Sequence, residues 1–298
     1  MEFLNGNYNK LVSLVDQLES IEKELKSFNP DKNDASVIKM NEIKEQLIEL
    51  LSEAIKSYDD ETRRGAAYGL SKIHDPAVIP ALTEAMKDND DMVRSWAVEG
   101  LGATKDKTVI PLLVKAMCDD SAYVYYSACT SLKKFDPNDL WDVLKRELMT
   151  ARPLAKKRII KLLGELREVR ALDFIIDMAL DEDAHIRYEC VEALRKIGDK
   201  KSVEILLKCL DDESKDVKTC SIQALRWMMD ERVLAALVRV CIENEDLRPM
   251  AIQAIVDISG EDVLSVITSA LEETKKIVDR TSEAVMSRFI SHQKLEVS

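Results

Sequence analysis

Few side chains in this sequence have the types and spacing that catalysis requires. The three histidines, His74, His185 and His292, stand far apart along the chain. A zinc site needs three or four clustered His, Cys or carboxylate ligands, and no motif of that kind is present. The sequence also contains no glycine-rich phosphate loop and no G-x-S-x-G nucleophile elbow. We therefore expect no catalytic residue, no metal and no cofactor.

One segment has the chemistry to bind a partner. The chain is acidic, with a net charge of −12 and a pI of about 5.0, which disfavours binding to nucleic acid or to anionic membranes. Between residues 145 and 161 the charge reverses, and the only acid is Glu147. The basic residues there are Lys145, Arg146, Arg152, Lys156, Lys157, Arg158 and Lys161. Tyr125 and Tyr126 precede the segment, so we hypothesise a docking point for an acidic protein; an ordinary solvated surface is the alternative.

The elements that position these residues follow from an internal repeat. Seven similar stretches begin five times at an interval of 31 residues and once at an interval of 30. They cover residues 62–70, 93–101, 124–132, 155–163, 186–194, 217–225 and 247–255. A fixed period of this size is typical of stacked supersecondary units, in which each unit buries its apolar face against its neighbours. The sequence therefore predicts an all-α solenoid of about seven helical hairpins with helical caps.

Each repeat contains two amphipathic patterns. With the first residue of each stretch as position 0, positions 0, 4, 5 and 8 are mostly apolar or small, which predicts a first helix, helix A. Position 7 is usually small and should let a neighbouring helix approach closely. A turn and a second apolar pattern follow and predict helix B. Acidic clusters such as 88–91 and 181–183 precede the A helices, where we expect them to cap the helix N-termini.

Position 1 carries a basic residue in six of the seven copies, and Tyr125 is the exception. The six are Arg63, Arg94, Lys156, Arg187, Lys218 and Arg248. Residues that a repeat fixes usually serve the stack itself. We predict an internal ladder in which each cation pairs with acids between repeats; a row of cations for an anionic ligand is the alternative.

Two tryptophans depart from the repeat pattern. Trp96 occupies position 3 and Trp227 occupies position 10, and the other copies carry mostly polar or small residues there. An aromatic side chain at a polar position is a candidate anchor for a partner, and local packing is the alternative. Trp141 instead replaces Ile79 and Ile110 at a core position, so we expect it to be buried.

The hairpin motifs resemble HEAT repeats. The resemblance rests on the start Asp90-x-x-Val93-Arg94, on the A-x-x-x-L seam and on the Ile-Pro pairs at 79–80 and 110–111. It covers residues 59–289 and implies a superhelix of paired helices. The short period is similar to that of the phycobilin lyases and of many archaeal and bacterial proteins. The copy that begins at Ala155 departs most from the pattern.

The resemblance leaves two kinds of function open. HEAT repeats imply a non-catalytic protein-binding scaffold or adaptor, which is our main interpretation. The alternative is an enzyme or chaperone that handles a tetrapyrrole, as the phycobilin lyases do. Deoxyhypusine hydroxylase, another protein with HEAT-like repeats, binds two irons through repeated His-Glu pairs. Here the histidines precede Asp75, Ile186 and Gln293, so that iron site does not carry over.

The remaining predictions concern location and domain boundaries. The N-terminus lacks the features of a signal peptide, no stretch is apolar enough to span a membrane, and the six cysteines form no CxxC motif. We expect a cytoplasmic protein whose cysteines pack as small apolar residues. Residues 1–57 should form a helical hairpin cap, 58–274 the repeats, and 275–298 a C-terminal capping helix and tail.

Overall fold

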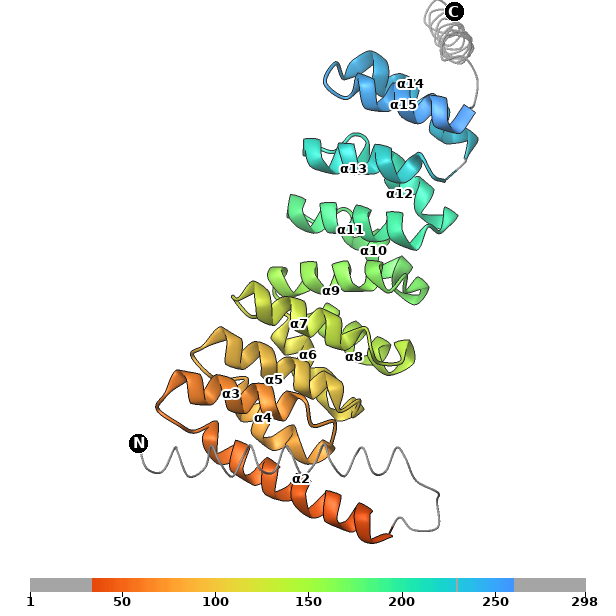
Figure 1. Ribbon diagram of the computed structural model, residues 1–298. Helices are drawn as coiled ribbons and strands as arrows, with labels where there is room; N and C mark the ends of the chain where they lie inside the picture. Colours follow the sequence, from red (N-terminus) through yellow and green to blue (C-terminus); the bar gives the residue numbers. More distant parts are fainter. Residues whose placement is uncertain (1–33, 229, 260–298) are drawn as a thin grey trace, which may run out of the picture. The chain divides into compact units, whose positions relative to one another are not determined.

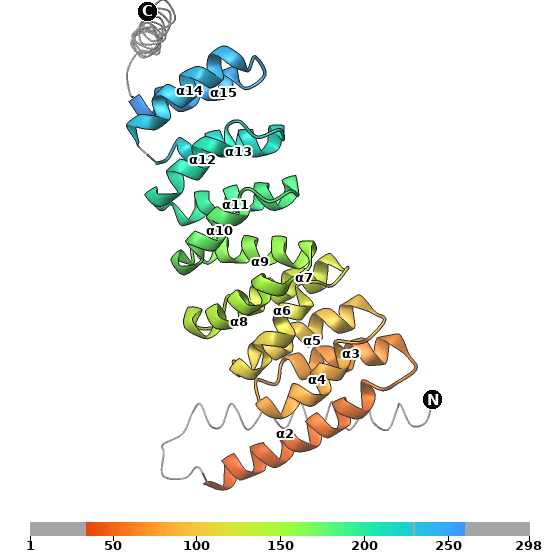
Figure 2. The same ribbon diagram turned by 180° about the vertical axis from the view of Figure 1, so that it is seen from behind.

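The computed structural model describes residues 34–228 and 230–259, and within these ranges the chain consists of helices and short connections without a strand. It divides into two compact units, Met1–Arg158 and Ile159–Ser298. Within each unit A and B helices alternate along the chain, and consecutive A helices lie side by side (Figures 1 and 2). The predicted all-α repeat fold is confirmed.

All seven predicted A helices are present. Six of them begin two residues before the first member of the repeat stretch. They are α3 (Asp60–Ser71), α5 (Asp91–Ala103), α7 (Ala122–Leu132), α9 (Pro153–Glu165), α11 (Ala184–Ile197), α13 (Lys215–Leu225) and α15 (Arg248–Ser259). The boundary between the two units falls within α9.

The B helices have two forms. In four copies a short 3-10 turn precedes a seven-residue helix: η2 (Pro76–Val78) and α4 (Ile79–Ala85), η3 (Lys107–Val109) and α6 (Ile110–Ala116), η4 (Val169–Ala171) and α10 (Leu172–Met178), η5 (Lys200–Ser202) and α12 (Val203–Cys209). The other two copies have one longer helix, α8 (Pro137–Thr150) or α14 (Glu231–Glu243). The turn after α8 is therefore unlike the turns after the short B helices.

Acidic residues cap three of the A helices as predicted. At α7 and α13 the N-cap residues are instead Ser121 and Ser214, whose side chains make no capping bond. Asp90 accepts hydrogen bonds from the backbone N–H groups of Met92 and Val93 at the start of α5, at 2.9 and 3.2 Å. Asp59 and Asp183 cap α3 and α11 in the same way. Each carboxylate satisfies backbone donors that the helix leaves free, so the acidic clusters fix where the A helices begin.

Small residues set the spacing between A helices. A Cβ atom on Gly100, at position 7 of α5, would lie 2.8 Å from the Ser71 Cα of α3. Gly102 approaches Ser131 of α7 even more closely, and in the second unit Gly164 meets Ala193. Position 7 of one helix thus packs on position 9 of the preceding one. The sequence pattern predicted the role of position 7 but not its counterpart at position 9.

Only part of the predicted caps lies in the described residues. Helix α2 (Asp34–Ala54) corresponds to the second helix of the N-terminal hairpin, and its Leu51 side chain packs 3.1 Å from the site of a Cβ on Gly69. The first helix of that hairpin and the C-terminal segment 275–298 lie outside the described residues. The predicted domain boundaries stay a prediction.

Candidate partner-binding surface

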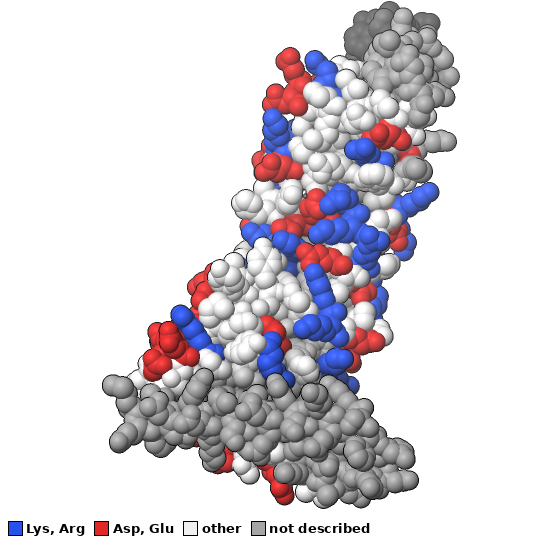
Figure 3. Space-filling model, viewed as in Figure 1, with Lys and Arg blue, Asp and Glu red and all other residues white. Residues whose placement is uncertain are grey.

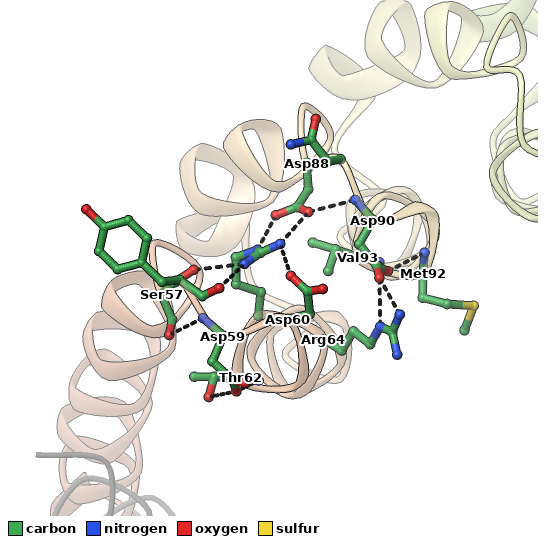
Figure 4. A network of polar contacts seen from close by, with 12 residues as sticks. Ser57, Asp59, Asp60, Thr62, Arg64, Asp88, Asp90, Met92 and Val93 are labelled. Carbon is green, nitrogen blue, oxygen red and sulfur yellow. Dashed lines mark hydrogen bonds and ion pairs between the residues drawn. The ribbon is translucent and has the colours of Figure 1, made fainter. Parts of the chain in front are cut away.

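The first A helix shows how the repeat uses its position 1 cation. Nε and Nη2 of Arg63 donate to the two carboxylate oxygens of Asp88, at 2.7 and 3.2 Å. Its Nη1 donates to the carbonyl oxygens of Ser57 and Tyr58, at 3.0 and 3.2 Å. One guanidinium therefore joins the connection before its own helix to the acid that follows helix B. Figure 4 shows this network beside the ion pair between Arg64 and Asp90.

The same arrangement recurs in two more copies. Arg94 pairs with Asp119 and donates to the carbonyl oxygens of Asp88 and Asn89. Arg187 pairs with Asp212 and donates to the carbonyl oxygens of Asp181 and Glu182. We call these three pairs, Arg63–Asp88, Arg94–Asp119 and Arg187–Asp212, the arginine ladder. The predicted internal role of the position 1 cations is confirmed at these copies.

The ladder favours the ionised forms of two of its carboxylates, Asp119 and Asp212. Burial opposes the ionisation of Asp119, but the hydrogen bonds from Arg94 and from the Ser121 N–H outweigh it, so the pKa of Asp119 is lowered. The balance at Asp212 is the same, with Arg187 as the donor. Charge-assisted bidentate bonds of this kind are among the stronger polar contacts in proteins.

The third copy lacks the arginine–aspartate pair, which we call a rung of the ladder. Tyr125 stands at position 1, and Thr150 stands where the neighbouring copies carry the paired aspartate. Arg158, from the next A helix, replaces part of the missing contact: its Nη1 donates to the carbonyl oxygens of Met117 and Asp119. Asp119 O corresponds to Ser57 O and Asp88 O in the intact rungs. The Arg158 guanidinium also lies 4.7 Å from the centre of the Tyr125 ring.

Arg158 and Tyr125, two of the residues that we proposed for partner binding, therefore contact each other inside the first unit. Both side chains are half-buried. Tyr126, next to Tyr125 with its ring 5.2 Å away, is 63% exposed. Of these two tyrosines, Tyr126 is thus the one that a partner can reach, because the Arg158 guanidinium lies over the ring of Tyr125.

The other basic residues of the segment fall into two groups. Lys145 lies 5.9 Å from the Trp141 ring, and both side chains make local contacts, with Trp141 half-buried rather than fully buried as expected. Lys161 is half-buried in the second unit and also has a partner. Side chains of the second group form no ion pair or hydrogen bond with any described residue. These are Arg146 and Arg152, both exposed, and Lys156 and Lys157, both half-buried.

Trp96 belongs to an aromatic cluster in the first unit. Its ring meets the Tyr68 ring edge to face at 4.9 Å. The ammonium group of Lys72 lies 4.8 Å from the Tyr68 ring and 5.5 Å from the Trp96 ring, and it also pairs with Glu99. Trp96 is half-buried and Tyr68 is 48% exposed. The sequence analysis did not identify Tyr68 and Lys72 as part of this cluster. The presence of aromatic residues in two consecutive copies, Tyr68 and Trp96, could have indicated it.

Trp227 lies in the second unit and is a separate feature. Its side chain is 68% exposed, and the Arg226 guanidinium lies 5.2 Å from its ring. Trp96 and the tyrosines of α7 belong instead to the first unit.

The A helices of the first unit form a largely uncharged surface. In Figure 3 the face over α3, α5 and α7 is mostly white, with acidic side chains along one edge. The hydroxyl groups of Ser95 and Ser127 meet across α5 and α7 at 2.9 Å, beside Trp96 and Tyr126. We call the surface formed by Tyr68, Trp96 and Tyr126 the aromatic face.

The described residues offer no metal site. They contain no group of three or more His, Cys, Asp or Glu side chains placed to hold an ion. Burial raises the pKa of the Cys209 thiol to about 11, and it also raises the pKa of Cys190 and Cys220. These thiols therefore stay protonated and pack as apolar groups. Among the described residues no helix combines the length and apolarity that a membrane crossing requires.

Comparisons with known proteins identify the family. A model of HEAT repeats matches residues 18–102, 85–153 and 142–226, which is more than half of the chain. The chain therefore belongs to the HEAT-repeat family. A chain in the solved structure of Kap95p with RanGDP has a TM-score of 0.54 and 15% identity; the match covers 74% of this chain and 36% of that one. This likeness concerns the fold.

Two further relatives have known activities. Deoxyhypusine hydroxylase of Emericella nidulans (strain FGSC A4) is 34% identical over 87 residues, which are 28% of this chain and 26% of that protein. The match thus spans about a quarter of that relative. The complex of CpcE and CpcF of phycocyanin lyase from Nostoc sp. PCC7120 has a TM-score of 0.35 and 18% identity, over 75% of this chain and 94% of that one.

Proposed function

We propose that this protein is a non-catalytic scaffold that binds another protein at the junction of α8 and α9, through residues 146–157 of its first unit. The observation that carries the proposal is the group of cations without internal partners: Arg146, Arg152, Lys156 and Lys157. In the arginine ladder the position 1 arginines pair with aspartates of the chain, so few of their N–H donors remain available to a ligand. At the junction the cations remain available.

The chemistry of these cations favours an acidic partner. Each is a basic side chain on a chain of net charge −12, and the exposed Tyr126 lies on the neighbouring helix. Charges of this kind steer a partner of opposite sign and reject partners of the same sign. Exposed ion pairs add little affinity, so the aromatic residues would supply most of the binding energy.

The test is a charge reversal that spares the fold. Arg146→Glu, Arg152→Glu and Lys157→Glu are changed together, and Arg158 is left intact because it bonds the backbone of the first unit. Lys115→Glu, Lys134→Glu and Lys201→Glu form the control, with the same change in charge at three exposed lysines. Partners captured from the native source are then quantified by mass spectrometry.

We expect the wild-type chain and the control to recover one acidic protein in near-stoichiometric amount, and the junction variant to lose it. Equal recovery by all three chains would contradict the proposal. Capture of a coloured carrier protein, with a visible absorption band, would instead favour a tetrapyrrole-handling role like that of the phycobilin lyases.

A further inference from the structure

The binding surface extends beyond the cations. We infer that the first unit recognises an acidic segment that carries an aromatic or large apolar residue, with the acids on Lys157 and Arg152 and the apolar residue on the aromatic face. This inference rests on the proposed function and specifies the partner of the same site. It treats the two unusual features of the first unit, the aromatic cluster and the unpaired cations, as parts of one surface.

A continuous series of contacts connects the two features. The Tyr68 and Trp96 rings join α3 to α5, and the serine pair of Ser95 and Ser127 joins α5 to α7. The contact of Arg158 with Tyr125 then joins α7 to the first half of α9. Tyr126 and Lys157 both occupy position 2 of their repeats, one residue after Tyr125 and one before Arg158. Trp96, Tyr126 and Lys157 thus lie on three consecutive A helices.

The spacing fixes the kind of segment that fits. Packed helices lie about 8–10 Å apart, so two steps from α5 to α9 span about 20 Å. An extended chain covers about 3.3 Å per residue, and the gap therefore corresponds to about six residues. Tyr126 lies on the middle helix and would contact the residues between the anchor and the acids.

Charge complementarity determines which end of the bound segment carries the acidic residues. The face over α3, α5 and α7 is largely uncharged in Figure 3, and Lys72 at its far end already pairs with Glu99. Arg152, Lys156 and Lys157, whose side chains bond no described residue, lie at the α9 end. An acidic run is therefore favoured at that end, and the apolar residue would come to Trp96 and Tyr68.

The test uses synthetic peptides and fluorescence anisotropy with the full-length chain. The first peptide has about 12 residues, with one phenylalanine separated by about six polar uncharged residues from a run of aspartates. The second has the same composition, but its phenylalanine adjoins the aspartates. The third has asparagine in place of aspartate. Each peptide is made in both chain directions.

We expect the first peptide to bind at least about tenfold more tightly than the other two, in one of its directions. Trp96→Ala should weaken it at least about tenfold, while Trp227→Ala, which removes an exposed tryptophan of the second unit, should change nothing. Tyr126→Ala serves as a second variant, because this exposed side chain can be removed without loss of the fold; we expect at least threefold weaker binding, as roughly half the effect of a central anchor.

Two outcomes would overturn the inference. The first is equal affinity for the spaced and the adjoining peptide. The second is an unchanged affinity of both Trp96→Ala and Tyr126→Ala variants whose circular dichroism matches the wild type. The proposed function has its own readout in partner capture. If the junction charge reversal still abolishes capture while the aromatic variants retain it, the inference fails and the proposed function stands.

Discussion

The second and third repeats differ in the residue at position 1, and this difference changes the contacts around it. In the second repeat Arg94 closes the stack through Asp119 and the carbonyl oxygens of the preceding connection. In the third repeat Tyr125 cannot make these bonds, and Arg158 of the following helix reaches back to Asp119 O and Met117 O instead. The polar backbone groups are satisfied in both cases, but by different helices.

This comparison separates structural cations from available ones. A rung of the arginine ladder needs both the cation and its aspartate, and the third repeat lacks both. The long helix α8 also runs through the position of the missing aspartate, so the connection that would hold it is absent. Near the junction, the side chains of Arg146, Arg152 and Lys157 also form no ion pair or hydrogen bond with a described residue, which is why we place the binding surface there.

The largest expected effect comes from removing an intact rung. Arg94→Met leaves Asp119 as a partly buried carboxylate without its bidentate partner, and we expect a loss of about 3 kcal/mol in the free energy of unfolding. Arg64→Met is the matched control, because that arginine is about half exposed and its loss should be clearly smaller. Urea denaturation followed by circular dichroism measures both. Similar losses in the two variants would mean that the ladder is not a special feature of the stack.

A smaller effect is expected from the helix contact of the regular copies. Gly102→Ala places a Cβ 2.3 Å from Ser131 Cβ, so α5 and α7 must separate, at a cost of about 1–3 kcal/mol. Gly65→Ala has no atom within 4 Å and should instead stabilise its helix by about 0.5–1 kcal/mol. We expect thermal unfolding to show a lower melting temperature for Gly102→Ala and a higher one for Gly65→Ala. A stabilising Gly102→Ala would contradict the close approach of the helices.

The substitute contact should have an effect of about 1 kcal/mol. Arg158→Met removes hydrogen bonds to two carbonyl oxygens and should destabilise the wild-type chain by roughly that amount. Tyr125→Arg supplies the arginine that other copies carry, and in that background Arg158→Met should cost little. A double-mutant cycle by urea denaturation measures the coupling. Additive effects would show that Arg158 does not replace the missing rung.

The smallest effect per residue is the dependence on pH. The pKa values of Asp119 and Asp212 are lowered in the fold, so folding favours their ionised forms. This stability is present above their ordinary pKa of about 4 and is lost as the pH falls through the lowered values. We expect the urea midpoint to fall below about pH 4, and to fall less in Arg94→Met, in which Asp119 has lost its donor. If the urea midpoint of that variant fell equally steeply with pH, the Arg94–Asp119 pair would not be a source of the pH dependence.

Much of the fold followed from the sequence because it depends on local rules that the period repeats. The apolar positions fixed the seven A helices, and acids before α3, α5 and α11 fixed the starts of these three through backbone capping. The ladder was predictable for a similar reason, since a cation that recurs with the period is expected to stabilise the stacking of the repeats. The matching small residues at position 9 are irregular in the sequence, and only the packing of α5 on α7 revealed them.

The candidate surface depended more on tertiary contacts. The sequence determined the unusual residues, including Trp96, Tyr125 and the basic segment, because each departs from a repeating pattern. Only the tertiary structure decided which of them face a partner. Arg158 donates to two backbone carbonyl oxygens and lies against the Tyr125 ring, whereas Arg152 and Tyr126 remained exposed. The physical reason is that the hydrogen-bonding needs of one connection are met by a helix more than 30 residues away, and a pattern of single positions does not encode that pairing.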